Sequence, residues 1–298
     1  MGILSFLQTT IGGIANGATY GLIGLGVVFL WQSVNRVNFA NISSCMLSVY
    51  IFYALSNRGA GNFAFAIVGG IVLTSLYGLV LRFLIYEPIT RRGGGGMEFV
   101  IATLMVSVFW LSVMSAIFTG IVWPFPREVG DPAALVHLGP LRISVVHVRI
   151  LAIVAFLIVF LHFFLRKTFL GKMLRATAQN REAAQLMGIN INLTTSVSFV
   201  LSTTMVGIAG LLLAPFYFVS LELGGGSVGL KGFAAAVMAG LSDPYGAILG
   251  GIALGLIENF TVLYISSAFR DVVSFFILIA VMIWKPRGIF NWTKVGEE

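Results

Sequence analysis

Long apolar runs recur along the whole of this sequence, and they limit what the chain can fold into. A helix rises about 1.5 Å per residue, so crossing the roughly 30 Å hydrocarbon core of a bilayer takes about 20 apolar residues. Nine segments are candidate crossings: 3–30, 38–56, 63–86, 98–122, 146–165, 193–214, 229–241, 245–264 and 270–285. The sequence therefore predicts one all-α integral membrane domain over residues 1–298, a polytopic bundle of about eight or nine transmembrane helices.

Two of these runs need a comment. The segment 229–241 is too short to cross comfortably, and Pro244 and several glycines flank it. We expect a half-helix or re-entrant segment, which is tolerated only where protein or a water-filled cavity covers its backbone. The first run begins at Ile3 with no basic residue before it and is longer than a signal-peptide core, so we expect it to be retained as a span.

The charged residues indicate orientation. Only 10% of the chain is charged and 58% is hydrophobic, whereas soluble proteins carry roughly 25% charged residues. The net charge of +7 comes from basic residues that stand singly or in pairs between apolar runs, without a basic face interleaved with aromatics, so it favours membrane topology over nucleic acid binding. Of the 18 Lys and Arg residues, 12 share one side if these are cytoplasmic: Arg36, Arg82, Arg91, Arg92, Arg166, Lys167, Lys172, Arg175, Arg181, Lys285, Arg287 and Lys294. This bias predicts an external N-terminus and a cytoplasmic C-terminus.

Two loops are long enough to have a function of their own. The outer loop, 122–148, contains four prolines, and its Leu135–Val146 stretch alternates apolar and polar residues around Gly139-Pro140. That pattern predicts a small β-hairpin. The inner loop, 166–192, is rich in Ala, Arg and Gln and should form short helices on the cytoplasmic face.

The inner loop carries a candidate docking motif. Arg175 precedes Glu182-Ala183-Ala184, and Gly188 follows after three more residues. A short helix of small residues can enter a cleft on a partner, and a glycine supplies the helix stop. The alternative is an ordinary amphipathic connector, since so short a pattern also arises by chance.

Short motifs in a fixed order give a resemblance to a known family. They are Asn16-Gly17, Tyr20-Gly21, Gly26, Asn38-Phe39-Ala40, the inner-loop motif, Lys231-Gly232-Phe233, Gly240, Gly246-Ala247, Gly250-Gly251, Gly255, Glu258, Asp271-Val272-Val273-Ser274-Phe275 and Pro286-Arg287-Gly288-Ile289-Phe290. In this order the chain resembles the H-type permease subunits of branched-chain amino acid ABC importers. The resemblance departs at Asn41-Ile42, where the family often has His-Gly, and at Ser242-Asp243-Pro244-Tyr245, where it often has a Gly-Ser or Gly-Asn turn. Both departures put the identity of the solute in doubt.

The resemblance implies a type II, BtuC-like permease in the bacterial inner membrane that works by alternating access. It implies four partners: a second, related permease subunit, two ATP-binding subunits and a periplasmic solute-binding protein; a homodimer of this chain stays open. ATP and Mg²⁺ would then be bound by the ATPase subunits and no cofactor by this chain. Arg175, Glu182, Ala183, Ala184 and Gly188 would contact the ATPase.

Polar residues inside the apolar runs are candidates for the substrate path. In lipid such groups need partners, so we expect them to face the bundle, where they either contact substrate or only bond neighbouring helices. Glu258 is costly inside a membrane and should face protein or water, or reach the outer interface. The candidates are Asn16, Thr19, Tyr20, Asn38, Asn41, Ser43, Ser44 and Glu258.

Glycines with helical spacing form a further pattern. Gly13, Gly17 and Gly21 share one face of the first run, and Gly246, Gly250, Gly251 and Gly255 recur in the eighth. Small residues at this spacing allow membrane helices to approach closely, which is the interpretation we favour over a pore lined by backbone.

Several functions lack their residues. No Gly-x-x-x-x-Gly-Lys-Ser/Thr motif occurs, so nucleotide chemistry must come from another chain, and Arg91-Arg92-Gly93-Gly94-Gly95-Gly96 is interpreted as a flexible linker. His137, His147 and His162 form no ligand cluster with carboxylates, and the lone Cys45 is expected to be a packed residue, so no metal or enzymatic role is predicted.

Two rival functions remain: a sister importer for urea, short amides or other amino acids, and a secondary transporter or channel. The latter would show inverted repeats or paired intramembrane charges, of which we find only a faint glycine-rich echo between 12–26 and 246–255.

Overall fold

The computed structural model describes residues 3–58, 62–138, 141–241, 243–285 and 288–289. The predicted hairpin turn Gly139-Pro140, Ser242, Pro286, Arg287, Phe290 and Lys294 lie outside the described residues. Within them, eight runs are long and apolar enough to cross a membrane: Leu4–Val34, Phe39–Asn57, Phe63–Arg91, Gly96–Phe118, Val145–Lys167, Ile191–Tyr217, Pro244–Tyr264 and Ser267–Trp284. The predicted polytopic helical bundle is confirmed.

The helices follow one another in the order that the apolar runs predict. They are α1 Ile3–Val34, η1 Phe39–Asn41, α2 Ser43–Arg58, α3 Phe63–Leu81, the π-helical turn η2 Arg82–Tyr86, α4 Glu87–Arg91, α5 Gly96–Phe118, α6 Val145–Lys167, α7 Phe169–Gln179, α8 Arg181–Leu186, α9 Ile191–Tyr217, α10 Glu222–Gly225, α11 Ser227–Met238, α12 Pro244–Tyr264, η3 Ser267–Phe269 and α13 Arg270–Trp284. At 12 residues α11 is about 18 Å long, too short to cross the core, as expected.

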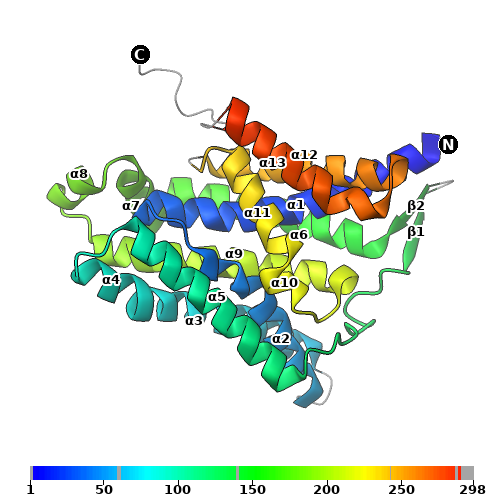
Figure 1. The fold of residues 1–298 in the computed structure, drawn as a ribbon, viewed down its shortest axis with the longest axis horizontal. Coiled ribbons are helices and arrows are strands. Elements are labelled where there is room, and N and C mark those ends of the chain that lie inside the picture. Colours follow the sequence, from blue (N-terminus) through cyan, green and yellow to red (C-terminus); the bar gives the residue numbers. More distant parts are fainter. Residues whose placement is uncertain (1–2, 59–61, 139–140, 242, 286–287, 290–298) are drawn as a thin grey trace.

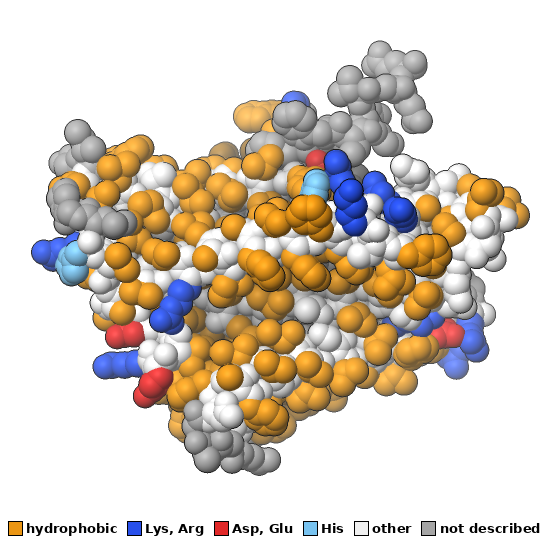
Figure 2. Space-filling view, turned by 180° about the vertical axis from the view of Figure 1, so that it is seen from behind, with side chains coloured by type: hydrophobic (Ala, Val, Ile, Leu, Met, Phe, Trp, Pro, Cys, Tyr) orange, Lys and Arg blue, Asp and Glu red, His pale blue; other side chains and the backbone are white. Residues whose placement is uncertain are grey.

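Most long helices run between two ends of the molecule (Figure 1). The N-terminus and the hairpin lie at one end, and α4, α7 and α8 lie at the other. At that second end Arg36 donates to the carbonyl of Gly94 at 3.0 Å, and Arg181 donates to the hydroxyl of Tyr86 at 3.1 Å. The segments that their basic residues assign to the cytoplasmic side therefore contact one another at this end. On the face in Figure 2, charged side chains gather toward the two ends and hydrophobic ones cover the middle, as a lipid-facing belt requires.

The hairpin and the inner-loop helices form where they are predicted. Strand β1 (Leu135–Leu138) pairs antiparallel with β2 (Leu141–Ser144), with Val136 opposite Ile143. In the inner loop, the side chains of Thr168 and Asn180 accept hydrogen bonds from the backbone N–H groups of Gly171 and Ala183, which caps α7 and α8.

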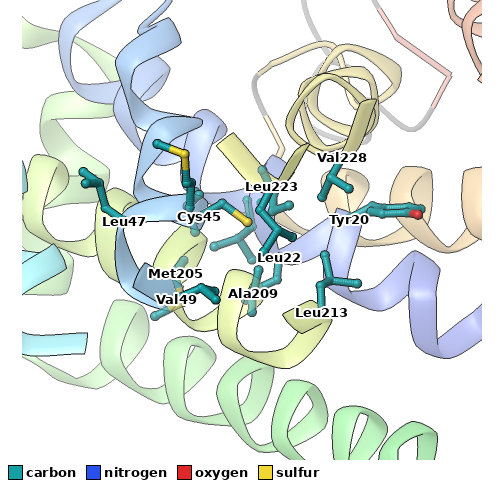
Figure 3. Packing of buried hydrophobic residues seen from close by; sticks show 14 of the residues in the cluster. Tyr20, Leu22, Cys45, Leu47, Val49, Met205, Ala209, Leu213, Leu223 and Val228 are labelled. Carbon is teal, nitrogen blue, oxygen red and sulfur yellow. The ribbon is translucent and has the colours of Figure 1, made fainter. Parts of the chain in front are cut away.

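The glycines of α1 and α12 hold the centre of the bundle together. A Cβ atom added to Gly17 would lie 2.6 Å from the carbonyl oxygen of Gly251, and one added to Gly255 would meet the backbone of Gly17. The two backbones therefore touch, and the close-packing interpretation of the glycine pattern is confirmed. Around this contact lies the apolar core, where Leu22 of α1 packs among buried side chains that include the thiol of Cys45 (Figure 3).

Candidate functional site

The second crossing does not begin as a regular helix. α1 ends at Val34, Asn35 takes a left-handed backbone conformation (φ 51°), and only the 3₁₀ turn η1 precedes α2. Such backbone is tolerated at membrane depth where protein covers it. Here the N–H of Phe39 donates to Thr103 Oγ1 at 3.3 Å, and the carbonyl of Ala40 accepts from the Tyr77 hydroxyl at 3.4 Å. In the broken segment 35–42, Asn35 is exposed, whereas residues 38–42 lie against α3 and α5.

Buried polar atoms without partners gather at this broken segment. Asn38 Oδ1, both amide atoms of Asn41 and Ser44 Oγ have no hydrogen-bond partner among the described residues. All three side chains are buried, so each unpaired group costs about 1–3 kcal/mol unless water or a ligand satisfies it. Ser43 differs, because its hydroxyl donates to Ser107 Oγ at 2.9 Å. The amides are the groups here that have hydrogen bonds to offer a passing solute.

Asn16 and Thr19 of α1 do not join this group. The hydroxyl of Thr19 is buried and donates to the carbonyl of Asn16 at 2.6 Å, within the same helix. The side chain of Asn16 is only half-buried. The hydroxyl of Thr19 therefore has a hydrogen-bond partner within α1 and does not need one from a solute.

A cluster of four charged side chains lies where α11, α12 and α13 meet. Lys231 Nζ is 3.1 Å from Glu258 Oε1 and 2.7 Å from Asp271 Oδ1, and Arg270 Nε also donates to Glu258 Oε1. The side chains of Lys231 and Glu258 are each 1% exposed, whereas those of Arg270 and Asp271 are 31% and 49% exposed. We call these four residues the charge cluster; its formal charges sum to zero.

Two tyrosines complete the surroundings of the charge cluster. Tyr20 donates to Glu258 Oε1 at 3.3 Å, and its hydroxyl is 3.1 Å from that of Tyr217. Lys231 Nζ lies 5.7 Å from the centre of the Tyr20 ring, a distance at which a cation and an aromatic face attract each other. In Figure 3 the hydroxyl of Tyr20 points away from the apolar side chains around it.

The charge cluster corrects two expectations. Lys231, one of the six basic residues that the orientation prediction leaves on the outer side, is buried in the bundle. No paired intramembrane charges are predicted from the sequence, whereas the structure places Glu258 beside both Lys231 and Arg270. Glu258 is buried and paired within the bundle, so it faces protein. Lys231 and Glu258 are 27 positions apart and on different helices, so no spacing rule links them.

The short helix α11 lies between the charge cluster and the broken segment. The ring of Phe233 lies 5.5 Å from that of Phe39, and a Cβ on Gly229 would meet Ile42, while Lys231 belongs to the charge cluster. α1 connects them too: Tyr20 contacts Glu258, and a Cβ on Gly26 would lie 3.6 Å from Asn41 Nδ2. Tyr20 and Gly26 are six residues apart, so the charge cluster and the amide of Asn41 contact α1 at points about 9 Å apart along its axis.

The second departure from the family pattern has a structural explanation. The carboxylate of Asp243 accepts from the backbone N–H of Tyr245 at 3.0 Å and caps α12, whose first residue is Pro244. The hydroxyl of Tyr245 lies 2.7 Å from His162 Nδ1 on α6. These residues therefore start and anchor a helix, whereas the amide of Asn41, at the first departure, has no hydrogen-bond partner among the residues that the structure describes.

The predicted docking residues lie on the surface of the inner loop, with one exception. Arg175, Glu182 and Ala183 are exposed, while Ala184 is buried. Gly188 ends α8 in the left-handed conformation (φ +83°), and Ile189 N–H donates to the carbonyl of Ala184 at 3.0 Å, which is the expected helix stop.

Sequence reasoning missed the two most exposed large hydrophobic side chains described in this loop. The side chains of Leu186 and Met187 are 89% and 84% exposed at the tip of α8. Because the loop lies at an end of the bundle rather than in the lipid-facing belt, exposed apolar side chains there indicate a protein contact.

Comparisons with known proteins agree along the whole chain. A family model described as "Branched-chain amino acid transport system / permease component" matches residues 9–282. The high-affinity branched-chain amino acid transport system permease protein LivH of Escherichia coli K12 is 30% identical over 304 residues, covering 99% of this chain and 98% of the relative. BraD of Pseudomonas aeruginosa, with the same description, is 28% identical over 305 residues and 99% of both chains. A probable branched-chain amino acid permease of Methanocaldococcus jannaschii is 29% identical over 288 residues, 92% of this chain and 90% of the relative. No solved structure matches significantly.

Proposed function

This chain belongs to the family of branched-chain amino acid transport permease components, and from that premise we propose that it carries branched-chain or similar small neutral amino acids across the inner membrane. The observation that carries the proposal is the match to LivH over 99% of the chain. Eight apolar helices support it. Asn38 Oδ1 and both amide atoms of Asn41 also support it, because they are buried without a partner among the described residues and a permeant needs hydrogen bonds that do not hold it tightly.

We propose further that the chain is the membrane subunit of a type II ABC importer. It would pair with a second, related permease, two ATP-binding subunits and a solute-binding protein, with ATP and Mg²⁺ bound by the ATPases. In this scheme the binding protein delivers solute at the hairpin end. ATP-driven closure of the ATPases moves the loop 166–192, and the bundle opens inward.

The rival solutes differ in charge chemistry. Urea and short amides are neutral, whereas an amino acid is a zwitterion at neutral pH. A neutral cluster of two cations and two carboxylates favours the zwitterion. Paired intramembrane charges would also suit a secondary transporter, but the family match over residues 9–282 favours the importer.

The test is transport by the reconstituted complex. Loading the binding protein with Leu, Ile or Val should stimulate the ATPase and drive uptake into vesicles. Replacing Asn41 with Ala should slow uptake by about fivefold, because one hydrogen bond along the path is worth about 1 kcal/mol. Asn57→Ala, at an exposed site in α2 and outside the loop 166–192, is the matched control and should leave uptake unchanged. Stimulation by urea or a sugar, without any response to aliphatic amino acids, would overturn the proposed solute.

The exposed tip of α8 should be needed for ATPase docking. We expect the Leu186→Ser/Met187→Ser double variant to lose co-purification with the ATPase while the permease stays folded, because these side chains are 89% and 84% exposed. Glu182→Lys and Gly188→Val should act in the same direction. Met97→Ser changes a 71% exposed methionine at the start of α5 and should leave docking intact. Normal ATPase association in the double variant would refute the docking role.

The proposed orientation can be tested by cysteine labelling in intact cells. The native Cys45 is buried, so it gives little background. A membrane-impermeant maleimide should label Ala133→Cys in the outer loop and leave Gln185→Cys in the inner loop unlabelled until the membrane is opened. The reverse pattern would invert the topology.

A further inference from the structure

The charge cluster has one feature that internal pairing leaves unexplained. Glu258 Oε1 accepts from Lys231, Arg270 and Tyr20, yet Glu258 Oε2 is buried and has no partner among the described residues. A buried carboxylate oxygen normally has a donor. Glu258 Oε2, beside two cations and a second carboxylate, is therefore an acceptor that the donor group of a ligand would satisfy.

The charge cluster is also open on one side. The side chain of Asp271 is 49% exposed and that of Arg270 is 31% exposed, while Lys231 and Glu258 form the closed floor. Glu258 is six residues before the end of α12, about 9 Å along the helix. A solute that approaches from the end of the bundle with the hairpin therefore meets Asp271 and Arg270 first.

We propose that the charge cluster binds the charged head of a zwitterionic amino acid at the outer part of the path. The α-ammonium group would donate to Glu258 Oε2 and to Asp271, and the α-carboxylate would accept from Arg270 and Lys231. This inference rests on the proposed function and adds the residues that distinguish a zwitterion from a neutral or singly charged solute.

Charge balance is the reason for this selectivity. The charge cluster is neutral, and a zwitterion keeps it neutral while replacing each internal pair by an equivalent one. A solute that carries only an ammonium or only a carboxylate would leave one uncompensated charge in a place where charges are poorly screened. A solute without charge would break ion pairs and restore none.

The position of the charge cluster also provides for release. Lys231 can return to Asp271, and Arg270 to Glu258, once the solute leaves, so the empty site is not left unpaired. The next polar groups are the amides of Asn38 and Asn41 on the other side of α11, which have free hydrogen-bonding atoms but no charge. A solute passed from ion pairs to neutral amides is held less tightly as it moves inward.

The test measures which charges of the solute are recognised. The purified complex in nanodiscs, without binding protein, is titrated with radiolabelled L-leucine against two analogues: L-leucinamide, which lacks the carboxylate, and 4-methylpentanoate, which lacks the ammonium. For the unmodified complex, each analogue should compete about tenfold or more less well than leucine. Asp271→Asn makes the cluster net positive and should shift preference toward 4-methylpentanoate. Arg270→Gln makes it net negative and should shift preference toward leucinamide.

Glu222→Gln is the matched control, because it removes an exposed carboxylate outside the charge cluster and should leave all three affinities unchanged. Opposite shifts in the two variants support the site, since a purely structural role would weaken every ligand alike. Equal losses in both variants, or no change in either, overturn it. Leucine-driven uptake is measured on the same preparation: if it fails while the opposite shifts are seen, the proposed function fails and the site stands.

Discussion

Replacing Glu258 with leucine should destabilise the folded bundle by about 3–5 kcal/mol, because breaking a buried ion pair by removing one partner leaves the other charge uncompensated. Glu258 Oε1 accepts from three groups, so its loss leaves Lys231 with the half-exposed Asp271 and Arg270 with the hydroxyl of Tyr20. Unfolding by sodium dodecyl sulfate, followed through tryptophan fluorescence, measures the free energy of unfolding.

Removing the buried partner as well should restore most of the stability. The double variant Glu258→Leu/Lys231→Met keeps Arg270 and Asp271, one charge of each sign, and replaces a buried pair by apolar groups, which is often close to neutral. Glu87→Leu is the matched control, because its partner Arg91 is 78% exposed and such pairs contribute about 0–1 kcal/mol. A double variant no more stable than Glu258→Leu would contradict the coupling.

Much of the architecture could be predicted because it depends on local patterns. The length of an apolar run determines whether it can cross, so the long helices and the short α11 follow from composition alone. The hairpin follows from alternation at period two, and the end of α8 from a glycine that accepts the left-handed conformation.

The candidate site could be predicted only in part, because it depends on contacts between distant helices. Asn38, Asn41 and Ser44 were candidates from their polarity, but whether a buried polar group finds a partner depends on the opposite helix: Ser43 has Ser107, and Asn41 has none among the described residues. The burial of Lys231 could not be predicted, for the same reason. Its partners Glu258 and Asp271 become neighbours only when α11, α12 and α13 pack.

The second large effect is expected at the contact between α1 and α12. Gly17→Ala should destabilise the bundle by about 3 kcal/mol or more. Overpacking usually costs about 1–3 kcal/mol, and a rigid contact lies at or above the top of that range. The added methyl would lie 2.6 Å from the carbonyl oxygen of Gly251 and 2.6 Å from Ile252 Cα, and backbone atoms cannot turn aside as a side chain can.

Gly12→Ala is a control within the same helix. Its added methyl would lie 3.5 Å from the ring of His147, an ordinary contact, and alanine is favoured over glycine in a helix by about 0.5–1 kcal/mol, so this variant should be neutral or slightly more stable. The same pair separates close packing from a pore lined by glycine backbone. If Gly17 only lined a pore, Gly17→Ala would have the same free energy of unfolding as Gly12→Ala, and its effect would be a lower rate of uptake. Loss of stability in Gly17→Ala alone assigns the glycines to the contact that holds α1, and with it Tyr20 and Gly26, in register with α12.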